Sequence, residues 1–429
     1  MAFTLSLSKL LKSEKNKRLF SNFISLLLIQ GTNYVLPLIT FPYLISKLGF
    51  AKFGILSFAS AFTYYMQVFV DYGFNLSATR AISKHRKDQA FVNDIFSSVL
   101  TIKVILTLIS FLVVSVLTKS VDAFSKDPAI FFLTFGMVIS SALFPLWLFQ
   151  GFEEMKYISR INISMKCLAT VLIFLIIQEE NDYIKVPIIY SVCLILASVI
   201  GLLFGTQKFN IKYTFPKFSD VEYHLKNSFH IFIAGFSGNL YGQGTVVILG
   251  FVATPQVVGF YATAEKIVKA LSGLMQPVSQ TLYPHISQMT AENQGIFLSQ
   301  TRKYVFFISF IISISLNFLG KDLLSIFFNC KELEIITSLR LLSVVLFFTY
   351  MNMYFNVFLL ALRLDNILSR LYLVVGISFL LFSYYLSLRY SLYGTCLSLL
   401  IVEVSIFMFS LYCLRKNQPN YLKPSYAIG

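Results

Sequence analysis

The chain has 429 residues and a formal net charge of +15, and 56% of its residues are hydrophobic while only 13% are charged. Soluble domains carry about 25% charged residues, so this composition excludes an ordinary soluble enzyme, a disordered protein and a disulfide-stapled secreted domain. The long apolar runs exclude an outer-membrane barrel, whose strands alternate apolar and polar residues. We therefore expect an all-α polytopic membrane protein with about twelve transmembrane helices and short connections.

Apolar segments long enough to cross a bilayer follow one another along the chain and predict its organisation. We expect a cytoplasmic N-terminal segment over 1–19, an N-terminal six-helix bundle over 20–207, a cytoplasmic linker over 208–227, a C-terminal six-helix bundle over 228–414 and a cytoplasmic tail over 415–429. The predicted spans are 20–46, 53–73, 95–118, 129–150, 158–177, 184–207, 228–251, 257–288, 303–320, 335–361, 367–388 and 392–414.

The positions of Lys and Arg predict the side of the membrane that each connection faces. With both termini in the cytoplasm, 22 of the 35 basic residues lie in cytoplasmic segments, 8 in external loops and 5 within spans. Cytoplasmic loops of membrane proteins carry such an excess of Lys and Arg. The orientation therefore accounts for the net charge, and no nucleic-acid partner is expected.

The longest polar stretch inside the chain, Gln207–Asn227, is basic and contains Pro216. It is predicted to link the two halves on the cytoplasmic side. Its lysines lie beside aromatic residues, a combination that suits anionic lipid headgroups. A solvated loop explains the same residues equally well.

The two halves share a short motif. Residues 48–59 and 249–264 both begin with Leu-Gly and continue through an apolar stretch in which Gly54 and Gly259 occupy matching places. Such a match has the form of a parallel repeat, as in transporters built from two similar halves.

The first helix of each half is interrupted by polar or helix-breaking residues. Pro37 and Pro42 bend the first span, and the seventh carries five glycines around Asn239. Interrupted segments at matching positions point to a transporter's central site, so Gln30, Asn33 and Asn239 are candidate substrate-binding residues. Static kinks and close helix packing are the alternative explanation.

Charged side chains within spans are a sharper signal, because a Lys at the centre of a membrane helix costs about 2.5–3.5 kcal/mol. Such residues usually face a water-filled cavity, and a cationic cavity suits an anionic phosphate or pyrophosphate group. Internal ion pairs are the alternative, and Lys103 and Arg340 lie close enough to span ends to reach the interface. The candidate substrate-binding cations are Lys103, Lys166, Lys266, Lys269 and Arg340, and the candidate gating or coupling acids are Asp71, Glu265 and Glu403.

No pattern of catalytic or metal-binding residues is found in the sequence. Walker, HExxH, CxxC and GxSxG motifs are absent, and no two of the 5 Cys have metal-ligand spacing. We expect neither an enzyme nor a cofactor or metal.

Five blocks of the sequence resemble the polysaccharide flippases of the MOP exporter superfamily, the O-antigen and capsule repeat-unit translocases of bacteria. They are "YVLPLITFPYLISKLGFAKFGILSFASAF" (Tyr34–Phe62), "VDYGFNLSATR" (Val70–Arg80), "FPLWLFQGFEEMKYI" (Phe144–Ile158), "VVGFYATAEKIVKAL" (Val257–Leu271) and "PVSQTLYPHIS" (Pro277–Ser287). They cover about the first two-thirds of the chain, and the last third matches only in hydropathy.

This resemblance implies a MATE-like fold of two six-helix bundles around a cationic cavity. It implies a multi-pass protein of the bacterial inner membrane that moves undecaprenyl-pyrophosphate-linked oligosaccharide from the inner to the outer leaflet. It also implies alternating access coupled to a proton or sodium ion, with membrane lipids and a polysaccharide polymerase complex as partners.

Three other functions are compatible with such a sequence. A multidrug exporter of the same superfamily handles cationic compounds, so carboxylates rather than lysines should dominate its cavity. A peptidoglycan-precursor flippase fits the quoted blocks less well. A membrane glycosyltransferase or polymerase would need acidic residues in a sizeable external loop, whereas the longest external loop here is about Lys321–Glu334.

Overall fold

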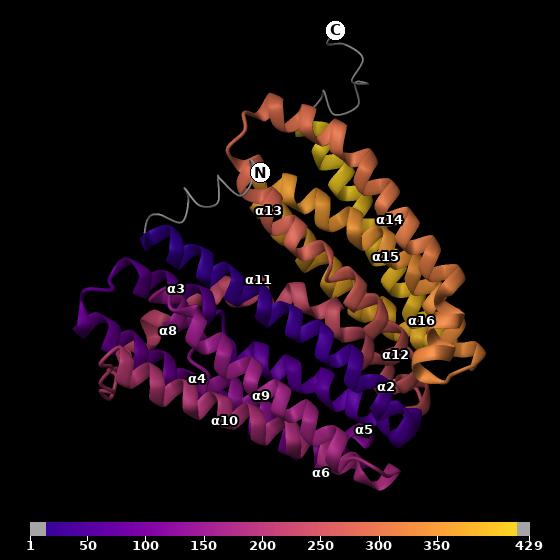
Figure 1. The fold of residues 1–429 in the computed structure, drawn as a ribbon, viewed down its shortest axis with the longest axis horizontal. Helices are drawn as coiled ribbons and strands as arrows, with labels where there is room; N and C mark the ends of the chain where they lie inside the picture. The colour runs from indigo at the N-terminus through magenta and orange to yellow at the C-terminus, as the bar shows by residue number, and fades with distance from the viewer. Residues whose placement is uncertain (1–13, 418–429) are drawn as a thin grey trace. The chain divides into compact units, whose positions relative to one another are not determined.

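The computed structural model describes residues 14–417, without the side chains of 14–27, 29, 30, 34, 234, 237, 241, 291, 292, 365 and 366. The backbone of this part of the chain is helical apart from turns and short connections, and it contains no strand. The expected all-α class is confirmed (Figure 1).

The first half of the chain forms nine α-helices and one 3₁₀-helix in the described residues. They are α2 (Glu14–Asp71), α3 (Phe74–Lys84), α4 (Gln89–Ser120), α5 (Asp122–Ser125), α6 (Pro128–Thr134), α7 (Gly136–Leu143), α8 (Leu146–Gly151), α9 (Met155–Ile176), η1 (Glu180–Ile184) and α10 (Lys185–Lys208). The second half forms α11 (Phe218–Val252), α12 (Pro255–Ser272), α13 (Met275–Ser287), α14 (Ala291–Phe328), α15 (Leu333–Ala361) and α16 (Asp365–Asn417).

Two of these helices contain a sharp kink where the sequence predicted a loop. In α2 the kink lies at Gly49, with φ 73° and ψ 168°, and in α16 it lies at Ser391, with φ 49° and ψ −128°. Glycine adopts positive φ without steric cost, so a single residue at position 49 replaces the expected loop over 47–52. The expected break between 388 and 392 is likewise one residue.

Eight helical stretches in the described residues are long and apolar enough to cross a membrane. Two of them, Gly31–Lys84 and Ile367–Asn417, have 54 and 51 residues and contain the kinks, so each can cross twice. The remaining predicted spans fall on α11 and on α12 with α13. Of these helices, α12 carries the charged cluster of Glu265, Lys266 and Lys269. This arrangement agrees with about twelve crossings.

The helices associate into two compact units. The first contains the residues up to Thr40 together with Ala59–Phe236, and the second contains Phe41–Phe58 together with the residues from Ser237 onward. The segment around the kink at Gly49 therefore belongs with the second half of the chain. The predicted bundle limits of 20–207 and 228–414 treat each half as one continuous stretch and stay a prediction.

Small residues bring α10 of the first unit close to α6 and α7. Ser140 and Ser198 hydrogen-bond through their hydroxyl groups at 2.7 Å, and the Ser191 hydroxyl donates to the carbonyl oxygen of Leu133 at 2.6 Å. A Cβ on Gly136 would lie 2.5 Å from the Cβ of Ser191. Close packing of small and hydroxyl-bearing residues is how helices associate in a bilayer, and here it forms one wall of the site described below.

In the second unit, the two glycines that the repeat pairs with each other are in contact. A Cβ on Gly54 would lie 1.8 Å from the carbonyl oxygen of Pro255, and a Cβ on Gly259 would lie 2.0 Å from that of Phe50. Pro255 lies four residues before Gly259, and Phe50 lies four residues before Gly54. The two contacts are therefore equivalent. The reciprocal geometry is what two related segments produce when they cross.

Replacing Gly54 by alanine should destabilise the protein by about 1–3 kcal/mol, because the new methyl group overlaps a backbone carbonyl that only a helix shift can move. The thermal unfolding temperature in detergent and the yield of folded protein should both fall. Gly238→Ala is the matched control, since a Cβ there meets nothing within 4 Å. Equal behaviour of the two variants would contradict the close crossing.

Candidate functional site

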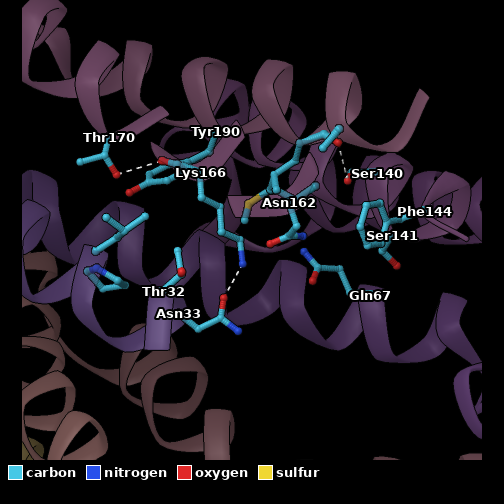
Figure 2. Close-up of a pocket in the computed structure, with 15 residues that line it drawn as sticks. Thr32, Asn33, Gln67, Ser140, Ser141, Phe144, Asn162, Lys166, Thr170 and Tyr190 are labelled. Atoms are coloured by element: carbon cyan, nitrogen blue, oxygen red, sulfur yellow. Dashed lines mark hydrogen bonds between the residues drawn. The ribbon is translucent and has the colours of Figure 1, made fainter. Parts of the chain in front are cut away.

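A pocket of about 350 Å³ that contains several polar side chains lies within the first unit, between α2, α7, α9 and α10 (Figure 2). This volume is typical of small-molecule sites. Its lining consists of Thr32, Asn33, Leu36, Pro37, Gln67, Met137, Ser140, Ser141, Phe144, Asn162, Lys166, Thr170, Tyr190, Leu194 and Ala197.

Helix α2 contributes to this pocket on both sides of its kink. Asn33 comes from the stretch before Gly49, and Gln67 comes from the stretch after it. Pro37 has no N–H group, so the carbonyl oxygen of Asn33 loses its usual helical donor. The α2 backbone at the pocket therefore offers an acceptor in addition to its side chains.

Lys166 is the charged residue of the pocket. Its Nζ atom donates a hydrogen bond to the Oδ1 atom of Asn33. Asn162 lies one turn earlier on the same face of α9, and its Oδ1 atom is buried without a hydrogen-bond partner in the described residues. Figure 2 shows the side chains of Lys166, Asn33, Gln67 and Asn162 directed into the same space.

The pocket combines groups that suit a phosphorylated sugar. Its described lining contains four amide or ammonium side chains, the hydroxyl groups of Ser140, Ser141 and Tyr190, and no carboxylate. Amides and hydroxyls both donate and accept hydrogen bonds, as sugar hydroxyl groups require. An ammonium group forms strong charge-assisted hydrogen bonds with phosphate oxygens.

Lys103 does not line this pocket but forms a buried ion pair beside it. Only 1% of its side chain is exposed, and its Nζ atom lies 3.0 Å from the Oδ1 atom of Asp71. Nζ also donates to the carbonyl oxygen of Ser141 at 3.3 Å, and the same Asp71 oxygen accepts from Asn75 at 2.8 Å. Lys103 therefore joins the pocket wall to the end of α2, where the backbone turns at Tyr72 and Gly73 with positive φ.

The charged cluster of α12 lies in the second unit. The Oε1 atom of Glu265 accepts from the Thr245 hydroxyl at 3.0 Å and from Lys269 Nζ at 3.1 Å. Lys269 also donates to the carbonyl oxygen of Gly242 at 2.8 Å. Lys266 points elsewhere: its Nζ atom lies 3.9 Å from the centre of the Phe41 ring, a cation–π contact.

Glu403 has a different environment. It is 6% exposed, and its Oε2 atom accepts from Asn352 Nδ2 at 2.6 Å. The same Nδ2 group donates to the Glu403 carbonyl oxygen at 2.9 Å, so the amide orientation is fixed by two acceptors. Glu403 forms no ion pair with any residue in the described part of the chain.

The remaining predicted site residues are Arg340, Asn239 and Gln30. Arg340 is exposed on α15, and its carbonyl oxygen accepts from Asn317 at 3.3 Å. Asn239 is half-buried on α11 in the second unit. The side chain of Gln30 lies outside the described residues.

Of the pocket residues, the sequence analysis singled out only Asn33 and Lys166 as candidate site residues. Asn162 could have been found from its position four residues before Lys166, and Gln67 from its position four before Asp71, because residues i and i+4 share a helix face. Tyr190 gave no such signal. Tyrosines are frequent in this chain, which has 24.

Comparison with known proteins adds sequence relatives. A model of the polysaccharide biosynthesis protein family matches residues 19–290. A candidate O-antigen transporter of Escherichia coli (strain K12) is 35% identical over 279 residues, covering 65% of this chain and 67% of that protein. A candidate O-antigen transporter of Shigella dysenteriae is 28% identical over 397 residues, covering 91% of this chain and 98% of that protein.

Solved structures with the same fold are transporters. The lipid II flippase MurJ, in an inward closed conformation, matches with a TM-score of 0.70 at 15% identity, covering 94% of this chain and 90% of that one. A multidrug resistance MATE family transporter of the MOP superfamily matches with a TM-score of 0.62 at 13% identity, covering 93% and 99%. These identities show the fold alone, and the expected MATE-like architecture is confirmed.

Proposed function

This chain belongs to the polysaccharide biosynthesis protein family, and from that premise we propose that it is a flippase for lipid-linked oligosaccharide. The substrate is an O-antigen or capsule repeat unit carried on undecaprenyl pyrophosphate. The protein moves it from the inner to the outer leaflet and catalyses no covalent reaction. The names of the Escherichia coli and Shigella dysenteriae relatives support the substrate class.

The observation that carries the proposal is the pocket around Lys166. An amphipathic oligosaccharide needs many hydrogen-bonding partners on its way through the membrane, because an unpaired hydroxyl in hydrocarbon costs about 4–8 kcal/mol on a cyclohexane scale. Amide and hydroxyl side chains from α2, α7, α9 and α10 supply such partners, and Lys166 adds a positive charge for a phosphate. The lipid tail can stay in the bilayer while the sugars occupy the protein.

The multidrug exporter fits the pocket less well. Cationic drugs would be held by carboxylates, whereas the described lining includes a lysine and no acid. The structural likeness to a MATE transporter is a likeness of fold and does not extend to the substrate.

Deleting the gene tests the flippase function directly. Lipid-linked repeat units should accumulate on the cytoplasmic side while their synthesis continues, and surface polysaccharide should disappear. The chain returned on a plasmid should restore export. Normal surface polysaccharide in the deletion strain, which must lack a second flippase gene, would overturn the proposal.

We propose that Glu403 couples transport to a proton or sodium ion. A carboxylate buried in a membrane helix is costly unless a cation or a proton neutralises it, and the contacts of Glu403 within the described residues are neutral groups such as Asn352. Binding and release of a cation at Glu403 would then accompany the conformational change.

The Glu403→Gln variant keeps an oxygen that can accept from Asn352 but cannot gain or lose a charge. We expect it to fold normally and to export at least about tenfold more slowly in response to a pH or sodium gradient. Ser405→Ala, an exposed position on the same helix, is the control. Unchanged dependence of export on both gradients would contradict coupling through Glu403.

We also propose that the protein lies in the bacterial inner membrane with both termini in the cytoplasm, as the distribution of Lys and Arg indicates. Reporter fusions after Lys87 and Asp220 should then report the cytoplasm. Fusions after Lys126 and Glu332 should report the external side. An external signal at Lys87 would reverse the orientation.

A further inference from the structure

The connection between α10 and α11 is held along one face of α4. We call Phe209–Lys217 the linker strap; its residues 211–217 have no regular secondary structure. Four polar side chains of α4, spaced four residues apart, hydrogen-bond to the strap: Gln89, Asn93, Ser97 and Thr101.

These contacts follow the strap in order along the helix. Gln89 donates to the carbonyl oxygens of Phe209 and Asn210, both at 3.1 Å. Further along, the Lys212 and Thr214 N–H groups donate to Asn93 and Ser97, each at 3.0 Å. The Tyr213 hydroxyl reaches Thr101 at 2.9 Å. Residues 89 and 101 of a helix are about 18 Å apart along its axis. The contacts of the strap therefore extend about 18 Å from the N-terminal end of α4.

The exposure of α4 shows the depth that the strap reaches. Counted from its N-terminal end, the first exposed large apolar side chain of α4 is Val104, at 44% exposure, and Leu108 and Leu112 follow. This apolar face, one turn beyond Thr101, is the surface that lipid chains must cover. Tyr213 therefore lies next to the level at which headgroups give way to hydrocarbon.

Directly after these contacts in the sequence, the chain exposes two phenylalanines beside lysines. Phe215 is 87% exposed and Phe218 is 81% exposed, while Lys212 and Lys217 are also exposed. Rings so exposed are unfavourable in water and favourable at a membrane boundary. Lysines beside them can reach phosphate groups while the rings contact lipid chains.

We propose that the linker strap, together with Phe218 at the start of α11, is a membrane-interface anchor. Phe215 and Phe218 insert into the cytoplasmic leaflet, and Lys212 and Lys217 bind anionic phospholipid headgroups. The hydrogen bonds to α4 hold it at that depth. The anchor depends on the membrane location and orientation of the protein and is independent of the transported molecule.

Tryptophan fluorescence of the full-length protein in vesicles tests this anchor. The chain has a single tryptophan, Trp147, which is 2% exposed, so the unaltered protein supplies the baseline. Phe215→Trp and Phe218→Trp should each add emission that lipids brominated near the top of their acyl chains quench. Lys87→Trp, at an exposed position in the turn between α3 and α4, should add emission that they do not quench.

The headgroup is tested in mixed vesicles in which only one lipid is brominated. Brominated phosphatidylglycerol should quench the Phe215→Trp signal at least about twofold more than the same fraction of brominated phosphatidylcholine. The preference should vanish when Lys212→Gln and Lys217→Gln are added.

Equal quenching by the two lipids would overturn the anionic-headgroup part of the proposal. A Phe215→Trp signal no more quenched than that of Lys87→Trp would overturn the membrane location of the strap. Neither result depends on whether the protein transports oligosaccharide.

Discussion

Replacing Lys166 by alanine is expected to reduce glycan export at least tenfold while leaving the amount of folded protein in the membrane unchanged. Lys166 is the cation of the described pocket, and its partner there is the neutral side chain of Asn33. Its removal therefore strands no buried charge. If the ammonium group holds a phosphate of the substrate, the lost charge-assisted contact costs roughly 1.5–3 kcal/mol, which is about 10- to 150-fold in affinity.

Two further variants make this result specific. Lys166→Arg should restore part of the export, because it keeps the charge but changes the shape of the donor. Lys156→Ala removes a half-buried lysine from the N-terminal end of the same helix, where it pairs with Glu154 at 3.7 Å, and should export normally. Binding of lipid-linked oligosaccharide to the purified variants gives the affinity directly. Wild-type affinity in Lys166→Ala would remove this lysine from the substrate site.

The spans were predictable because hydropathy and the cost of unpaired charge are local properties of the sequence. The apolar segments recur as helices, and Lys166, which lies in the middle of a predicted span, lines the described pocket. Its contact with Asn33 also joins two of the predicted residues. The first and fifth predicted spans thus meet at Asn33 and Lys166, polar side chains whose exposure to lipid would be unfavourable.

The assignment of partners to the other charges could not be read from hydropathy. It depends on how each helix is rotated and on the depth at which it crosses its neighbours. Lys103 and Lys269 meet the carboxylates of Asp71 and Glu265, while Lys266 contacts the ring of Phe41. Two of the predicted cations, Lys103 and Lys269, therefore pair with a carboxylate of their own unit.

The kink at Gly49 was equally hidden. A glycine between two apolar stretches predicts a loop as well as a sharp bend, and only the backbone, which is helical on both sides of Gly49, shows which of them forms. For the strap between α10 and α11, the sequence likewise allowed two interpretations, a solvated loop and a lipid contact. Its hydrogen bonds to α4 indicate how deeply the strap lies in the membrane, which the composition of the segment does not show.

The pair of Lys103 and Asp71 should be the most sensitive to single substitutions. Removing one partner of a buried ion pair costs about 3–5 kcal/mol. The two halves of the pair are not equal, because Lys103 is 1% exposed while the Asp71 side chain is 27% exposed and keeps its hydrogen bond from Asn75. Asp71→Ala, which leaves the buried ammonium group alone, should therefore destabilise the protein more than Lys103→Met. Thermal unfolding in detergent measures both.

The double variant Asp71→Ala with Lys103→Met separates stability from gating. If the pair only neutralises charge within the first unit, the double variant should recover most of the lost stability and export normally, since neither charge remains buried. If Asp71 acts as a gate at the end of α2, where the backbone turns through Tyr72 and Gly73, the double variant should recover stability but not export. A double variant no more stable than Asp71→Ala alone would show that the energetic coupling between the two residues is absent.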